Sequence, residues 1–165
     1  MIDETSLAEI HPGARLVWLA DRARQRIVRE LERRLRRDVG ISVAQAGGLI
    51  VIGEYKQVAM RTLAEALDIG QPAVTGLVRR MEDRDLVRRL HDAKDARVQR
   101  LMLTATGRAA RKKAINVLNT FNDRIEGEIP EIDRPAVFRF LEQSSFDLED
   151  EPAPARRSRA VARRR

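Results

Sequence analysis

Apolar residues recur three or four positions apart between Arg15 and Arg37, a spacing that lines them along one face of a helix. We expect Gly40 to end this helix. Its other faces carry nine arginines, relieved only by Asp21, Glu30 and Glu32, and should therefore face solvent. The narrow apolar stripe then needs a partner helix. Its members are Leu16, Leu19, Ala23, Ile27, Leu31 and Leu35.

Shorter helical segments follow. Ser42 and Gln45 form a capping box that starts a helix running to about Tyr55. Residues 61–68 predict a short apolar helix that ends in a tight turn. Pro72 opens another helix, because proline lacks an N–H that the first turn would leave unbonded anyway. The apolar face of that helix is made of Val74, Leu77, Val78 and Met81.

Two segments of alternating character, Leu86–Leu90 and Val98–Leu103, predict strands joined by the charged loop His91–Arg97. A winged helix-turn-helix contains, in this order, a short helix, a sharp turn, an amphipathic helix and a basic hairpin, and this chain follows the same order. We therefore expect a mainly α protein with a small two-stranded β wing.

The C-terminal part predicts two more helices and a tail. Thr104 can cap a long helix to about Ile125. Asp133 and Pro135 start a last one. From Glu149 onward there are too few apolar residues to offset the entropy of ordering, so we expect a disordered, arginine-rich tail. That tail either adds phosphate contacts to DNA or only solubilises the chain.

The composition limits the classes of molecule that the chain is expected to bind. The 165 residues suit one domain with appendages, and 32 basic against 25 acidic residues give a net charge of +7. Such a basic chain is expected to meet phosphates, in nucleic acid or on a membrane surface. The absence of cysteine excludes disulfides, thiolate zinc sites and thiol redox sensing. Without a signal peptide or a long apolar run, we expect a cytoplasmic protein that does not enter the membrane.

The outward face of the helix that Pro72 opens is the candidate reading element. Ala73 and Gly76 would let the backbone approach the major groove, and Arg79 can reach guanine or phosphate. Thr75 offers a hydroxyl to DNA or, alternatively, turns it back onto the helix. Arg79 and Arg80 could also contact phosphates and so position the protein without specifying sequence.

The sequence resembles the MarR family of bacterial transcription regulators. The similarity runs through the segments Leu63–Ile69, Pro72–Glu82, Leu86–Arg89, Asp95–Arg97 and Leu101–Gly107. Asp68 and Asp85 depart from the pattern, since each stands at a turn where the family usually has glycine. Aspartate tolerates left-handed backbone better than most residues, so we expect the turns to form with mild strain.

The resemblance implies an obligate homodimer whose first and last helices interlock, with two recognition helices in successive major grooves of a pseudo-palindromic operator. It also implies that Arg97 enters the flanking minor groove, with Asp95 holding its guanidinium. The expected DNA-binding residues are Gln71, Pro72, Ala73, Thr75, Gly76, Arg79, Arg80, Arg88, Lys94, Asp95 and Arg97. The expected organisation is an N-terminal dimerisation helix in residues 1–40, a DNA-binding domain in 41–104, C-terminal dimerisation helices in 105–148, and the tail in 149–165.

The resemblance further implies a small-molecule effector that binds between the dimerisation helices and the reading head and releases DNA. Trp18 and Arg15 are candidates for its pocket, with His11 a weaker one. Alternatively, Trp18 belongs to the core or to the dimer interface.

We therefore expect a sequence-specific, ligand-responsive transcriptional regulator, most often a repressor in this family. The alternative is a non-specific architectural DNA-binding protein, and a more distant one is an enzyme or ligand-binding protein with a vestigial DNA head. An enzyme is not expected, because His11 and His91 lack the partners of a metal site or a catalytic triad. Gly48–Gly53 imitates a phosphate loop only superficially, because Glu54 follows it. No metal or cofactor is expected.

Overall fold

The computed structural model describes residues 15–91 and 99–144, which fall into two compact units, Met1–Asp123 and Arg124–Arg165. The predictions for His11, Lys94, Asp95, Arg97 and the tail 149–165 lie outside the described residues.

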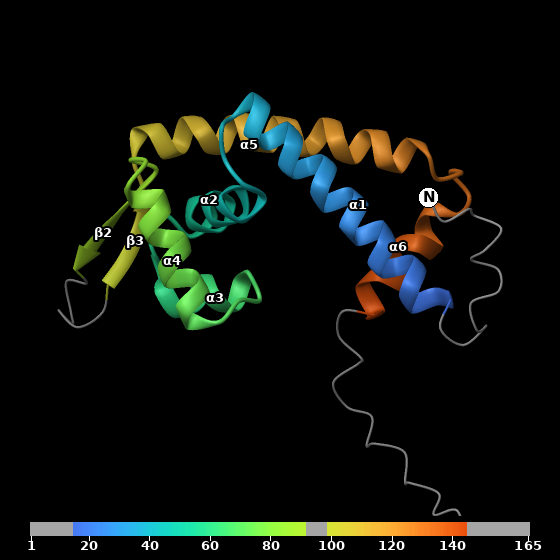
Figure 1. The fold of residues 1–165 in the computed structure, drawn as a ribbon, viewed down its shortest axis with the longest axis horizontal. Helices are drawn as coiled ribbons and strands as arrows, with labels where there is room; N and C mark the ends of the chain where they lie inside the picture. Colours follow the sequence, from blue (N-terminus) through green and yellow to red (C-terminus); the bar gives the residue numbers. More distant parts are fainter. Residues whose placement is uncertain (1–14, 92–98, 145–165) are drawn as a thin grey trace, which may run out of the picture. The chain divides into compact units, whose positions relative to one another are not determined.

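Helices dominate the first unit (Figure 1). They are α1 (Arg15–Asp38), α2 (Val43–Tyr55), α3 (Met60–Ala66), α4 (Gln71–Glu82) and most of α5 (Ala105–Gly127). Their bounds agree with the predicted segments to within about two residues. The mainly α winged helix fold is confirmed.

The capping box forms at the start of α2 as predicted. The hydroxyl of Ser42 accepts a hydrogen bond from the backbone N–H of Gln45 (3.2 Å), and the Gln45 amide oxygen accepts one from Ser42 N–H (3.0 Å). Glu32 of α1 accepts the next N–H, that of Val43 (2.6 Å). Three free N–H groups of the helix end are thereby satisfied, and α2 is tied to α1.

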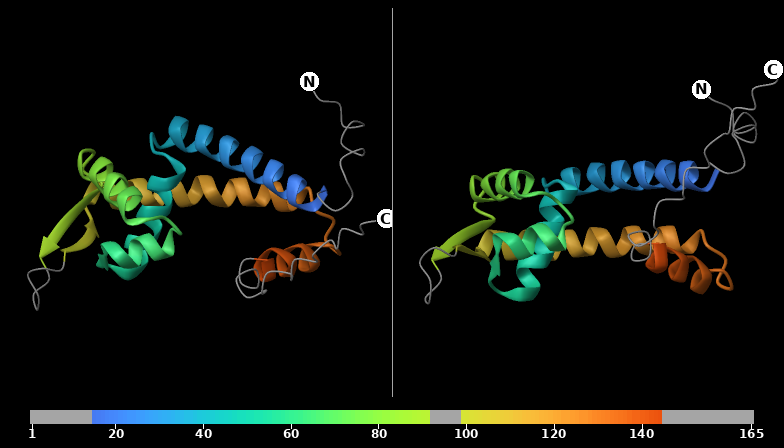
Figure 2. Two further views of the ribbon diagram at one scale, coloured as in Figure 1. Left: turned by 60° about the horizontal axis from the view of Figure 1, so that its bottom comes forward. Right: turned by 90° about the horizontal axis from the view of Figure 1, so that it is seen from below.

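The prediction of a two-stranded wing was wrong, because the sheet has three antiparallel strands in the order β1-β3-β2. The third, β1, is only Val58–Ala59, and it pairs Val58 with Leu101 of β3. Two residues are too few to show an alternating pattern, so only the pairing defines this strand. The other strands, β2 (Val87–His91) and β3 (Gln99–Leu103), form the predicted hairpin, which extends beyond α3 and α4 in Figure 2. His91 belongs to β2 rather than to the loop.

Asp68 and Asp85, which stand at the two turns where the resemblance led us to expect glycine, adopt left-handed backbone, with φ of 49° and 51°. Each lies in a Schellman motif. Ile69 N–H bonds Ala64 O (3.0 Å) at the end of α3, and Leu86 N–H bonds Met81 O (2.9 Å) after α4. The prediction of left-handed turns at these positions is confirmed.

The core of the first unit lies between α2, α3, α4 and the sheet, where Leu49, Leu63, Leu77 and Leu101 are fully buried. The stripe of α1 is only partly covered. Leu31 and Leu35 are buried, whereas Leu16, Leu19 and Ile27 are 60%, 43% and 40% exposed. The N-terminal half of α1 therefore shows apolar surface to solvent.

The second unit contains the last residues of α5 and α6 (Arg134–Ser144). Asp133 begins α6 as predicted, since its carbonyl accepts from Val137 N–H (3.0 Å). Phe138, Phe140 and Leu141 are exposed on α6. Among the described helices, none has the length and apolar character needed to cross a membrane.

Candidate nucleic-acid interface

The helix α4 has one buried and one exposed face. Val74, Leu77, Val78 and Met81 are at most 1% exposed and anchor the helix in the core. The opposite face shows polar and basic side chains to solvent, as the sequence predicted. The exposed residues of the expected DNA-binding set on this helix are Gln71, Pro72, Ala73, Thr75, Arg79 and Arg80, and Gly76 is half-buried.

Two details of this face could not be derived from the sequence. The hydroxyl of Thr75 donates to the backbone oxygen of Gln71 (2.9 Å), so its proton is engaged and the oxygen is left as an acceptor. Arg80 lies along the helix over Gly76, because a Cβ at that glycine would be 3.3 Å from Arg80 Nη1. The glycine thus leaves room for the guanidinium beside the helix.

The two neighbouring arginines of β2 differ in their surroundings. Arg89 bonds Glu82 at the end of α4 (3.1 Å) and Gln99 of β3 (3.0 Å), so it joins the wing to the reading helix. Arg88 projects from the other face of the strand and is exposed beside Asp85 and Arg108, where it remains available to an anion.

The start of α5 is bonded to the turn that follows α4. The hydroxyl of Thr104 donates to the carbonyl of Asp85 (2.5 Å) and accepts from Gly107 N–H (2.9 Å), which confirms its capping role. Thr106 donates to the Asp85 carboxylate (3.0 Å), and Thr104 N–H bonds Leu86 O (3.2 Å). These bonds tie the first turn of α5 to the turn that follows α4.

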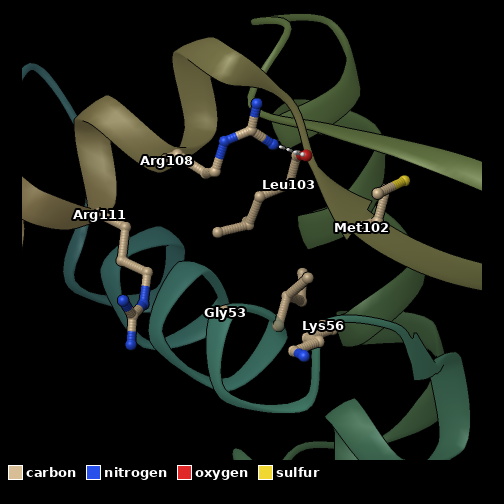
Figure 3. A pocket seen from close by; sticks show the side chains of 7 residues that line it. Gly53, Lys56, Met102, Leu103, Arg108 and Arg111 are labelled. Atoms are coloured by element: carbon tan, nitrogen blue, oxygen red, sulfur yellow. Dashed lines mark hydrogen bonds between the residues drawn. The ribbon is translucent and has the colours of Figure 1, made fainter.

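A cavity of about 430 Å³ lies between the end of α2, β3 and the first two turns of α5 (Figure 3). Its lining combines apolar groups with three cations, Lys56, Arg108 and Arg111. The remaining lining residues are Ile52, Gly53, Met102 and Leu103. The sequence analysis missed this site. Its only signal is that Arg108 and Arg111 stand three residues apart on one helix face.

Side-chain contacts hold two of these cations. Arg111 forms an ion pair with Glu54 of α2. Arg108 donates to the carbonyl of Leu103 (3.0 Å), the bond that is dashed in Figure 3. Lys56 occupies the centre of a three-residue γ-turn closed by Gln57 N–H on Tyr55 O (2.6 Å), with φ of 59°.

The effector candidates Trp18 and Arg15 are not among the residues that line this cavity. Trp18 is half-buried, and the guanidinium of Arg22 stacks over its ring at 5.1 Å from the centroid. The side chain of Arg15 lies outside the described part of the chain. A ligand role for this pair stays a prediction.

The arginines of α1 are largely engaged in exposed ion pairs along the helix. Glu30 accepts from both Arg33 (2.7 Å) and Arg34 (2.8 Å), and these hydrogen bonds lower the pKa of its carboxyl to about 2. Arg34 also stacks over the ring of Phe121 in α5, 5.2 Å from its centroid. The Glu30 carboxylate thus orients a side chain that joins α1 to α5. Within residues 15–91 and 99–144, no cluster of acidic and histidine side chains could hold a metal ion.

The sequence model of the MarR family matches residues 39–98, a range that includes α2, α3, α4 and β2. No curated protein sequence matches the chain.

Solved structures share the fold over most of the chain. One concerns the regulation of DNA binding of Bordetella bronchiseptica BpsR by 6-hydroxynicotinic acid, with 24% identity, 82% of this chain and 96% of that one covered, and a TM-score of 0.74. Another is CouR from Rhodococcus jostii RHA1 bound to p-coumaroyl-CoA. It has 22% identity and a TM-score of 0.71, and the match covers 88% of this chain and 98% of that one. A third is the S. aureus MepR–DNA complex. It has 19% identity and a TM-score of 0.73, and the match covers 78% of this chain and 95% of that one.

Proposed function

Because residues 39–98 match the sequence model of the MarR family, we propose that the chain is a transcriptional regulator that binds a specific DNA operator as a homodimer and releases it when an effector binds. The observation that carries this proposal is α4, whose apolar face is buried while its polar and basic face is exposed beside a basic hairpin. The match to the MarR family model, and the likeness to a solved transcriptional regulator of that family, support the prediction that the chain is not an enzyme.

For the DNA contacts, we propose that the N-terminal part of α4 enters the major groove. Small side chains at Ala73 and Gly76 allow close approach, and Arg79 and Arg80 reach bases or phosphates. Arg88 would bind the backbone beside the groove. Lys94, Asp95 and Arg97 complete the proposed site from the hairpin loop, with Arg97 in the minor groove.

For the dimer, we propose that the apolar surfaces of α1 and α6 are covered by a second copy of the chain. Exposed apolar residues concentrated on two helices are typical of an oligomer interface. They are Leu16, Val17, Leu19, Ile27 and Val28 on α1, and Phe138, Phe140 and Leu141 on α6. In this organisation residues 1–40 and 105–148 carry dimerisation and residues 41–104 carry DNA binding.

For regulation, we propose repression that a small molecule relieves. Two proteins of this fold support the proposal of a small-molecule ligand, because the DNA binding of BpsR is regulated by 6-hydroxynicotinic acid and CouR binds p-coumaroyl-CoA. In such a scheme the effector stabilises a spacing of the two DNA-binding heads that fits the operator poorly. A regulator of chromosomal genes acts in the cytoplasm, which is the compartment that we propose.

The test is selection of bound duplexes from a random DNA library at about 150 mM salt, where simple charge attraction is partly screened. We expect enrichment of an inverted repeat whose half-sites lie one helical turn apart. Binding without an enriched motif, and with a steep loss of affinity as salt rises, would instead support the architectural alternative.

A further inference from the structure

We propose that Arg84 is a positioning residue that fixes the angle between α1 and the reading helix α4, and that it thereby sets the half-site spacing that the dimer accepts. The geometric half of this proposal stands on contacts within one chain, while the spacing half rests on the proposed function.

The corner between α1 and α2 decides the direction in which α1 leaves the DNA-binding elements. Gly40 turns the chain there with a φ of 77°, and Ile41 N–H bonds Leu35 O (3.3 Å) to close the turn. Ile41 is only 1% exposed, so the corner is anchored in the core. The helix α2 begins at Val43, directly after this short connection.

The side chain of Arg84 is bonded to this corner from the segment that follows α4. Its Nη1 donates to the carbonyl oxygen of Gly40 (2.6 Å) and lies 3.5 Å from the amide oxygen of Gln45, a buried side chain. Its Nη2 lies 3.4 Å from the place that a Cβ at position 40 would occupy, so glycine leaves room for the guanidinium. Hydrogen bonds from a charged donor are roughly twice as strong as neutral ones. Arg84 therefore holds the corner at a fixed distance from the end of α4.

The backbone of Arg84 is itself fixed by its neighbour. Asp85 has left-handed backbone, and its carbonyl and carboxylate accept hydrogen bonds from Thr104 and Thr106 at the start of α5. Because the turn after α4 is held in this way, the bond of Arg84 to Gly40 restrains the corner rather than the turn.

Other contacts of α1 reach different elements. Glu32 accepts from the N–H of Val43 in α2, and Arg34 stacks over Phe121 of α5. Arg84 adds a connection to α4, the element that we assign to the major groove.

The length of α1 makes a small change at the corner large at the far end. With 24 residues, α1 is about 36 Å long at the rise of a regular helix. A change of about 10° at the corner would move the far end by about 6 Å relative to α4, close to the rise of two base pairs. The exposed apolar half of α1 is the surface that we assign to the partner copy. A loose corner would therefore let the two reading helices of the dimer change their separation.

The geometric half is tested by measuring a distance distribution within one chain, without DNA. The chain contains no cysteine, so Gln25→Cys in α1 and Ala73→Cys in α4, both at exposed positions, take nitroxide labels at these two places alone. Dilution with excess unlabelled protein removes distances between copies. Pulsed electron paramagnetic resonance should give a narrow distribution when Arg84 is present and one at least about twice as broad in Arg84→Met. Equal widths overturn the proposal.

Two further variants separate the Arg84 bond from a general effect of charge. Arg84→Lys keeps a charged donor for the Gly40 carbonyl and should give a narrower distribution than Arg84→Met. Lys112→Met removes a charge from an exposed position of α5 and should leave the distribution as it is in the wild type. Thermal unfolding verifies that each variant is folded. Equal broadening in Lys112→Met would attribute the effect to charge alone and overturn the proposal.

The spacing half is tested with duplexes that carry the selected half-sites at the selected separation and at separations one base pair shorter and longer. We expect the wild type to prefer the selected separation about tenfold or more, and Arg84→Met to prefer it about threefold or less. The base preference within each half-site should stay the same. A purely structural role of Arg84, or a phosphate contact by its side chain, would lower the affinity for all three duplexes in the same proportion. That result overturns the spacing half.

Failure of the proposed function gives a different result. A chain that selects no inverted repeat overturns the proposed function and with it the spacing half, while the distance measurement still decides the geometric half.

Discussion

The α-carbon of Gly107 in α5 faces the carbonyl oxygen of Leu86 so closely that a Cβ would overlap it. The oxygen belongs to backbone at the start of the wing, so it cannot rotate away as a side chain would. We expect Gly107→Ala to lower the free energy of unfolding by about 2–3 kcal/mol, because α5 must shift from the turn behind α4. Urea denaturation measures this change.

The control is Gly127→Ala at the end of α5, where no atom would lie within 4 Å of the added Cβ. It should change the stability by less than about 0.5 kcal/mol. Equal effects of the two substitutions would contradict the close approach at Gly107.

Asp68→Gly should stabilise the protein by about 0.5–1 kcal/mol, because its left-handed backbone suits glycine better than aspartate. Asp85→Gly relieves the same strain but removes the carboxylate that accepts from Thr106. It should therefore stabilise less than Asp68→Gly or not at all. Thermal unfolding of both variants tests this order, and a larger gain at position 85 would argue against it.

Arg79→Ala should weaken binding to the selected operator by about 1–3 kcal/mol if the side chain contacts a base, with a smaller effect on unrelated duplexes. Lys113→Ala removes one exposed charge from α5, away from α4, and serves as the control. Fluorescence anisotropy at constant salt measures the affinity of both variants for the operator and for unrelated duplexes. An equal loss on all duplexes would make Arg79 a phosphate contact, and no loss would remove it from the interface.

Ile27→Asp should dissociate the dimer, because it places a charge on the exposed apolar face of α1 that we assign to the partner copy. Sedimentation velocity should then show a monomer that retains helical circular dichroism. Leu31 and Phe121 are unsuitable for this test, since both are buried within one chain and an acidic residue there would unfold it.

The control for the dimer is Gln25→Asp, an acidic substitution on an exposed position of α1 outside the apolar stripe. It should remain dimeric. An Ile27→Asp protein that sediments as a dimer would exclude this face from the interface.

Acid should lower the melting temperature of the wild type more than that of the Glu30→Gln variant. The pKa of Glu30 is lowered to about 2 by its bonds to Arg33 and Arg34, so its ionised form stabilises the fold above the ordinary pKa of 4.5. That contribution is lost as the pH falls from about 4.5 towards 2. The melting temperatures of wild type and variant should therefore converge over this range. Exposed Glu142→Gln is the control, and parallel curves for Glu30→Gln would refute the role of Glu30.

Much of the fold could be predicted from the sequence because its signals are local. Ser42 and Gln45 cap α2 across three residues, and Thr104 caps α5 in the same way. Helical spacing alone correctly assigned the buried and exposed faces of α4. The left-handed turns at Asp68 and Asp85 were predicted because the family that the sequence resembles usually has glycine at both positions.

What depends on distant segments could not be predicted. The strand β1 exists only through its pairing with Leu101, more than forty positions away, and the hydroxyl of Thr75 could have faced DNA or its own helix with equal local justification. Arg89 appeared as one more basic residue of the hairpin until its bond to Glu82 showed that it joins the wing to α4.

By itself the sequence determined the order and bounds of the helices, the orientation of the reading helix and the basic character of the chain, because periodicity and capping act over a few residues. Only the tertiary structure decided that Gly53, Lys56, Leu103, Arg108 and Arg111 surround one cavity. These residues come from two segments, 52–56 and 102–111, which lie more than forty positions apart, and no local pattern encodes which segments pack together. The close packing of α2, β3 and α5 brings their charges into one place.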